Sequence, residues 1–158
     1  MNKLTPVIHV QTFEQALKNV EICVNTNVDG LWLINHSISC NKLASIYKEV
    51  RNQFPCFWIG INVLDVHPLK AIGKFDNIQG FWVDNPYLNE ERKEQPDADS
   101  IRVLLKEKHP QCKYFGGVAF KYQPPPTDLQ KMVLLANEYL DVITTSGDST
   151  GNITDLFK

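Results

Sequence analysis

Residues 113–151 read KYFGGVAFKYQPPPTDLQKMVLLANEYLDVITTSGDSTG, and this stretch decides the fold. The apolar run Tyr114–Phe120 has the length of a buried strand. Three prolines at 124–126 prevent the strand from continuing. Thr127 or Asp128 can then cap a helix whose apolar residues recur at helical spacing.

A second predicted strand, Asp141–Thr145, follows that helix directly and ends in the polar turn Ser146–Gly151. The stretch is therefore one strand–helix–strand unit. Its polar groups come just after the carboxyl ends of the strands, where α/β sheets and barrels carry their binding sites.

The same unit recurs upstream, and the intervening segments have helical periodicity and end at turn residues or prolines. Thr12 can cap the first of these helices, and Asp97 or Asp99 can cap the one that Pro110 ends. The other predicted strands are continuous, mainly apolar runs rather than alternating ones, which is typical of parallel strands that are covered on both faces. They span residues 6–10, 31–35, 57–64 and 78–83.

This alternation predicts an α/β protein of (β/α) repeats, with about six units in a TIM-barrel-like parallel sheet. An open doubly wound sheet fits the same pattern. A closed eight-stranded barrel usually takes about 250 residues, whereas this chain has 158. We therefore expect a single barrel-like domain, 1–158, that is incomplete relative to an eight-fold barrel. A natural truncation, a fragment, and a partial barrel that closes as a homodimer all agree with this length.

Composition excludes several classes of protein. The net charge of −2 gives no basic surface for nucleic acid. No apolar stretch approaches the length of a membrane span, and no signal peptide is recognisable. The four cysteines are widely spaced and form no C-x-x-C pair, which favours reduced thiols in a cytoplasmic protein. No metal ligand set and no cofactor motif is present.

Polar residues gather at the predicted carboxyl ends of the strands, and a parallel sheet would bring them to one rim. We expect ligand-binding groups among them, with Lys121, Asp84 and His9 as the catalytic candidates. The others are Asn35, His36, Asn62, Asp65, Asn85, Ser146, Gly147, Asp148, Ser149, Thr150 and Gly151.

Each catalytic candidate has a role and a plain structural alternative. The amine of Lys121, partly shielded behind small residues, could act as a Schiff-base nucleophile, a base or a phosphate ligand; a salt-bridged lysine is the alternative. Asp84 could be a general base or a hydroxyl ligand, or only the first residue of a turn before Pro86. His9 and His36 could transfer protons, or simply be hydrogen-bonded.

Two further groups are ambiguous. The turn 146–151 could present backbone N–H groups to an anion, although it is neither a P-loop nor a dinucleotide fingerprint; a tight strand-to-helix turn is the alternative. Trp32, Trp58 and Trp82 fall in successive strands. We expect them to pack in the core, and the less favoured alternative is a surface on which the ring of a ligand stacks.

Several segments, in order, resemble the BtpA family of (β/α)-barrel proteins. IGINVLDVHP (59–68) is similar to a family strand of the type V-G-V-x-V-L followed by a polar turn ending in Pro. Two later strand ends of the family resemble FKYQPPP (120–126) and DVITTSGDSTG (141–151). The first two strands of the family resemble PVIHV (6–10) and VDGLWLINH (28–36). Tyr122 stands where the family usually has His, and Asp84-Asn85 departs from the family pattern.

The resemblance implies two kinds of function. Members have been linked to photosystem I assembly, and some look like sugar- or nucleoside-processing enzymes. The sequence therefore predicts either an enzyme for a small polar or phosphorylated sugar or nucleoside, or a non-catalytic assembly factor. An inactive partial barrel is the third alternative.

Overall fold

The structure is a computed structural model that describes residues 3–147. Strands and helices alternate throughout this part of the chain. The strands are β1 (Val7–His9), β2 (Leu31–Asn35), β3 (Ile59–Val63), β4 (Gly80–Val83), β5 (Lys113–Gly117) and β6 (Val142–Thr144). The helices are α1 (Phe13–Asn25), α2 (Cys40–Gln53), α3 (Pro68–Ile72), α4 (Pro96–Lys108) and α5 (Leu129–Tyr139).

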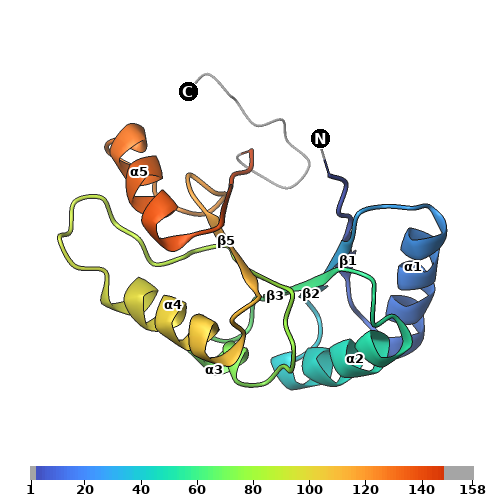
Figure 1. Cartoon of the computed structure of the whole chain (residues 1–158). Coiled ribbons are helices and arrows are strands. Elements are labelled where there is room, and N and C mark those ends of the chain that lie inside the picture. The colour runs from blue at the N-terminus through green and yellow to red at the C-terminus, as the bar shows by residue number, and fades with distance from the viewer. Residues whose placement is uncertain (1–2, 148–158) are drawn as a thin grey trace.

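The strands form one sheet in the order β1-β2-β3-β4-β5-β6, and every neighbouring pair is parallel. A doubly wound sheet reverses its strand order at a switch point, and this sheet does not. The chain therefore has the (β/α) barrel-like architecture, and the predicted fold class is confirmed. The sheet curves into an open arc with the helices on its convex side (Figure 1).

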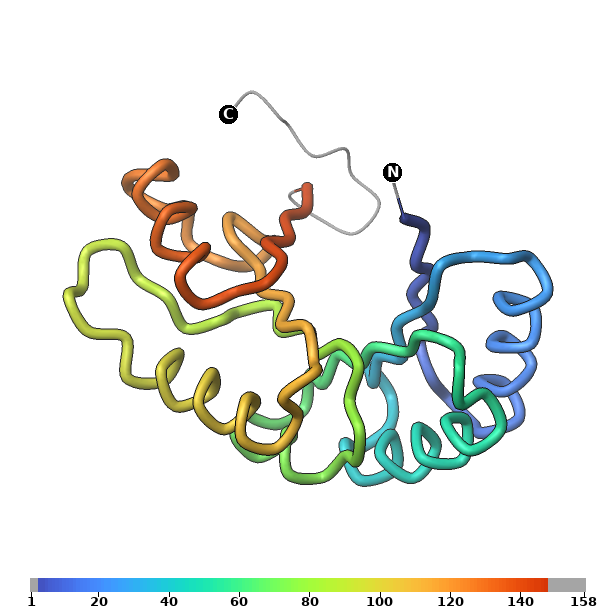
Figure 2. Tube along the Cα trace, viewed as in Figure 1, coloured from blue at the N-terminus to red at the C-terminus, as the bar shows by residue number. Residues whose placement is uncertain are grey.

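The arc does not close. β1 and β6 are the two edge strands of the sheet, and no strand among residues 3–147 pairs with their outer edges. The concave face of the sheet lies between these two edges (Figure 2). An open parallel sheet of this kind exposes part of the surface that a complete barrel would bury.

The main core lies between the sheet and the helices. Leu33, Ile61 and Phe81 on three successive strands are at most 1% exposed and belong to one cluster with buried helix residues such as Val20 and Leu43. Because side chains alternate along a strand, the residues next to these face the concave side.

The concave side is covered by large aromatic rings over glycines. Trp32 packs edge-to-face against Trp58, Trp82 and Phe115, with ring centroids 5.0, 5.5 and 4.7 Å apart. The position of a Cβ atom on Gly60 is occupied by the Trp32 ring. The expected core-packing role of the tryptophans thus takes the form of a second, aromatic layer on the inner face.

Two local expectations are wrong. β5 ends at Gly117 and not at Phe120, because Ala119 (φ 47°) and Tyr122 (φ 68°) turn the chain out of the sheet. Helix α4 begins at Pro96 after Gln95, whose side chain makes no capping bond, rather than at a cap of Asp97 or Asp99. Proline at the first helical position favours this earlier start.

The helix caps at Thr12 and Asp128 agree with the sequence: each side chain accepts a hydrogen bond from the backbone N–H three residues on. Within residues 3–147, no helix is both long and apolar enough to span a membrane.

Candidate functional site

The carboxyl ends of the strands meet at one end of the concave face, which we call the mouth. It is defined by His9, His36, Asn62, Asp84 and Lys121. The register places Asn62 beside Trp82, so Asn62 projects to the same concave side as the tryptophan layer. Asp84 follows Trp82 by two residues and therefore projects to that side too.

Asn62 and Asp84 form the polar centre of the mouth. The Nδ2 group of Asn62 donates a hydrogen bond of 2.9 Å to Oδ1 of Asp84. Asn62 is completely buried, whereas Asp84 is half-buried. A buried amide thus orients one carboxylate oxygen of Asp84 and leaves the carboxylate within reach of solvent.

Three buried polar atoms on the inner face of the sheet have no hydrogen-bond partner among residues 3–147: Asn62 Oδ1, Trp82 Nε1 and Thr144 Oγ1. They come from β3, β4 and β6. An unsatisfied buried donor or acceptor costs about 1–3 kcal/mol, so each of these atoms needs an explanation. Such atoms concentrate where a polar ligand completes the hydrogen bonding.

A cluster of basic side chains forms another side of the mouth. The imidazole rings of His9 and His36 are stacked, with centroids 4.6 Å apart and an interplanar angle of 27°. Both residues are exposed. Partial burial, together with the positive charges of His36 and Lys121, lowers the pKa of His9 below its usual value.

Lys121 lies in the loop after β5 rather than at the strand end. Its backbone N–H donates to Ser146 Oγ at 2.8 Å, which ties this loop to the segment after β6. Its ammonium lies 5.9 Å from the ring of Phe120 and 5.8 Å from the ring of Tyr122. The positive charge of Lys121 makes the smallest of the three contributions that lower the pKa of His9.

Gln123 holds this loop in place, and sequence reasoning missed it. Its Nε2 donates to the carbonyl oxygens of Asp84 (2.7 Å) and Gly117 (3.1 Å), and its Oε1 accepts from the N–H of Phe120 (3.1 Å). One amide therefore joins the ends of β4 and β5. The only sequence signal was its position just before the three prolines. Thr144 was also missed, since a threonine in a short strand attracts no attention.

Asn35 and Asn85 do not face the mouth cluster. Asn35 is 1% exposed; its Nδ2 donates to Asp65 Oδ1 (2.6 Å) and its Oδ1 accepts from the N–H of Leu64 (2.8 Å). Asp65 also accepts from the N–H of Cys40 at the start of α2 (3.0 Å). The side chain of Asn85 accepts from the N–H of Tyr87 (2.8 Å) within a turn. These residues organise the loops around the mouth.

Only the first two residues of the predicted anion-binding turn, Ser146 and Gly147, belong to the described part of the chain. Ser146 Oγ, besides accepting from Lys121, donates to the carbonyl oxygen of Gly147 at 3.0 Å, and Gly147 is buried. Asp148, Ser149, Thr150 and Gly151 lie outside the described residues. Among the residues that are described, no group of three or more His, Cys, Asp or Glu side chains is arranged to hold a metal ion.

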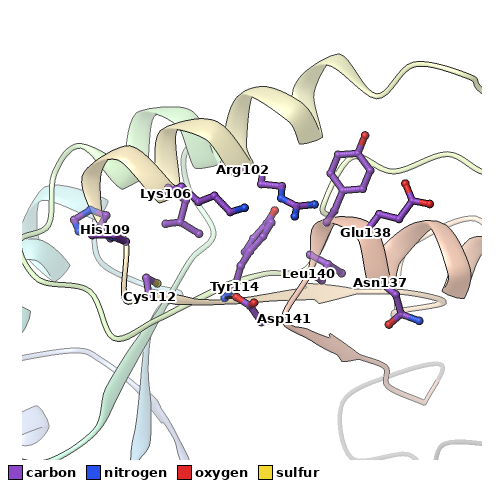
Figure 3. A pocket seen from close by; sticks show the side chains of 12 residues that line it. Arg102, Lys106, His109, Cys112, Tyr114, Asn137, Glu138, Leu140 and Asp141 are labelled. Atoms are coloured by element: carbon purple, nitrogen blue, oxygen red, sulfur yellow. Dashed lines mark hydrogen bonds between the residues drawn. The ribbon is translucent and has the colours of Figure 1, made fainter.

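The described residues form two cavities, one away from the mouth and one beside it. One, of about 210 Å³, opens between α4 and α5 at the amino ends of β5 and β6, and Arg102, Lys106 and Tyr114 line it (Figure 3). The other, of about 290 Å³, lies under the three prolines beside the mouth. Asn85 and Gln123 line it, and at its edge Glu90 Oε1 accepts from the N–H of Thr127 (2.7 Å).

No model of a known protein family matches the chain, and no curated protein matches it. The mouth is therefore interpreted from its own geometry.

Proposed function

We propose that the protein is a BtpA-like (β/α)-barrel protein that binds a small polar or phosphorylated sugar or nucleoside at the mouth and acts on it by acid–base chemistry. The observation that carries this proposal is the set of unpartnered atoms Asn62 Oδ1, Trp82 Nε1 and Thr144 Oγ1 on the inner face of the sheet. A ligand with several hydroxyl groups offers donors and acceptors to such a set.

The surroundings of these atoms support a ring-shaped ligand. Trp58, Trp82 and Phe115 are half-buried on the concave side and offer apolar faces next to the polar atoms. Ligand sites commonly combine an apolar lining with a few well-placed polar groups. A sugar or nucleobase ring over these faces, with hydroxyl groups toward Asn62 and Asp84, uses both features.

The three catalytic candidates take complementary roles. The lowered pKa of His9 keeps its imidazole neutral at pH 7, which suits a general base. Asp84, oriented by Asn62, accepts a hydrogen bond from a ligand hydroxyl or takes its proton. Lys121 supplies the positive charge that stabilises an anionic group of the ligand or of the transition state.

Ligand-dependent melting tests the binding part of the proposal. Phosphorylated and unphosphorylated sugars and nucleosides are screened with the full chain. A ligand present at 100 times its Kd should stabilise the fold by about 2.7 kcal/mol, which for this chain length raises Tm by about 5–11 °C. Lys121→Ala should abolish that increase. A panel in which no compound raises Tm would overturn the proposal.

Asp84→Asn tests the chemical part. The amide keeps the size of the side chain and can still accept from Asn62, so the fold and much of the binding should remain while turnover is lost. Asp76→Asn is the matched control, because Asp76 is exposed in the turn before the same strand, at the opposite end of the sheet. Equal turnover by Asp84→Asn and the unchanged protein would exclude Asp84 as the base.

A non-catalytic role in assembly is the second candidate, favoured by the outer edges of β1 and β6, with which no strand of the described residues 3–147 pairs. An exposed strand edge offers backbone groups to another chain, either a partner protein or a second copy. Sedimentation of the full chain distinguishes these cases. A compact dimer that withstands dilution supports closure by a second copy, and a monomer that binds no ligand favours the assembly role.

We infer a cytoplasmic location from the thiols. Cys23, Cys40, Cys56 and Cys112 are all unpaired, and two of them are buried. Reduced cysteines are typical of proteins in a reducing compartment.

A further inference from the structure

A polar cavity lies at the opposite end of the sheet from the mouth, and the proposed function makes no use of it. It has a volume of about 210 Å³ and opens between the carboxyl-terminal halves of α4 and α5, beside the amino ends of β5 and β6. Pockets that take drug-sized ligands measure about 300–1,000 Å³. The cavity therefore suits a small molecule.

The cavity has a basic wall and an acidic wall. Arg102 and Lys106 lie one helical turn apart on α4 and form the basic wall, and the Arg102 guanidinium lies 5.7 Å from the centroid of the Tyr139 ring. Glu138 on α5 and Asp141 before β6 form the acidic wall. Among residues 3–147, no ion pair joins the two walls. The charges balance in number but do not pair with one another.

The hydroxyl group of Tyr114 is left unsatisfied in this cavity. Tyr114 lines the cavity from β5, is 3% exposed, and its hydroxyl has no hydrogen-bond partner among the described residues. The side chains of Arg102 and Lys106 point toward this hydroxyl from α4 (Figure 3). Burial raises the pKa of Tyr114 well above its usual value, so the hydroxyl keeps its proton and is a donor. A donor beside two cations favours a negatively charged oxygen of a ligand.

The acidic wall favours a positive group on the same ligand. Oδ2 of Asp141 accepts a hydrogen bond of 2.7 Å from the backbone N–H of Tyr114, which holds this carboxylate beside the start of β5. Glu138 is exposed in the last turn of α5. A simple anion would be attracted by the basic wall and repelled by these two carboxylates. A ligand that carries both charges avoids this repulsion.

We infer that the cavity is a second binding site, which takes a small zwitterion of the α-amino acid type. Its carboxylate lies against Arg102, whose planar fork of donors matches a carboxylate, and accepts from the Tyr114 hydroxyl. Its ammonium group lies against Glu138 and Asp141. Because the cavity and the mouth lie at opposite ends of the sheet, this inference does not depend on the proposed function.

Thermal melting of the full chain with each of the standard L-α-amino acids tests the site. A bound amino acid at 100 times its Kd should raise Tm by about 5–11 °C. The related amine and the related carboxylic acid, which each keep one of the two charges, should bind more weakly; for L-alanine these are ethylamine and propionate. A panel in which no amino acid raises Tm would overturn the inference, and so would an acid that binds as tightly as its amino acid.

Histidine resonances in NMR spectra locate the bound amino acid. His109 lines this cavity at the end of α4, whereas His9 lies in the mouth. The amino acid should shift the resonances of His109 and leave those of His9 unchanged. A shift of His9 without a shift of His109 would place the amino acid in the mouth and refute the second site.

Calorimetry on variants tests the individual contacts. Tyr114→Phe, Arg102→Gln and Glu138→Gln should each weaken amino-acid binding by about 10- to 100-fold, the range of one charge-assisted hydrogen bond. Lys108→Gln and Glu107→Gln are the matched controls, because both residues are exposed on α4 outside the lining of the cavity. The controls should keep the full affinity. Equal weakening by all five variants would show nonspecific attraction, and full affinity in Tyr114→Phe and Arg102→Gln would exclude the site.

Discussion

Replacing Gly60 by alanine tests the aromatic layer on the inner face of the sheet. A Cβ atom at this position would lie 2.5 Å from Cε3 and 2.9 Å from Cη2 of Trp32, which is 4% exposed. Real Cβ contacts are not that short, so the ring or the strand has to move. The Trp32 ring packs against the rings of Trp58, Trp82 and Phe115, so it is held on several sides.

The magnitude follows from this confinement. Adding a methyl group to a packed core typically costs about 1–3 kcal/mol, and a ring held on several sides belongs in the upper half of that range. For a chain of 158 residues, about 2–3 kcal/mol corresponds to a fall in Tm of about 4–12 °C. Thermal unfolding followed by circular dichroism measures the fall, and tryptophan fluorescence reports whether the ring has moved.

Gly73→Ala is the matched control. Gly73 has φ −76° at the end of α3, and a Cβ atom there would meet nothing within 4 Å. Alanine should leave stability unchanged or raise it by about 0.4–1 kcal/mol, because it restricts the unfolded chain. Trp32→Phe in the Gly60→Ala background should recover part of the loss, since the smaller ring relieves the clash. A Gly60→Ala protein that melts with the unchanged chain would refute the described packing.

Three further predictions concern single groups, each measured by chemical or thermal unfolding. Tyr114→Phe should leave stability equal or higher, because the buried Tyr114 hydroxyl has no partner among the described residues; a loss above about 1 kcal/mol would contradict this. Asn35→Ala should destabilise the fold by about 1–3 kcal/mol, since it leaves the N–H of Leu64 and one oxygen of Asp65 without their partner; a neutral result would exclude this network. The lowered pKa of His9 means that the unfolded chain binds more protons, so this group reduces stability as the pH falls through its unfolded value of about 6.5 toward the folded value. His9→Gln should flatten that part of the stability–pH curve, and an unchanged slope would contradict the reasoning.

The sequence determined the local structure well, for reasons that lie within each segment. Leu31–Asn35 is a strand because it begins with four successive apolar residues and contains no glycine or proline. Thr12 and Asp128 begin helices because their side chains satisfy backbone N–H groups that lie three residues away. The alternation of strands and helices was sufficient to predict a parallel sheet, because a helix that connects two strands returns the chain to the same end of the sheet, so that successive strands run in the same direction.

Only the tertiary structure decided which side of the sheet each polar residue faces. Asn35 and Asn62 both occupy fully buried strands, yet Asn35 bonds to the α2 connection and Asn62 faces Asp84 in the mouth. Strands that are apolar on both faces show no alternation from which a side could be inferred. The unpartnered atoms of Trp82 and Thr144 are likewise consequences of register between strands, and register is a property of the assembled sheet.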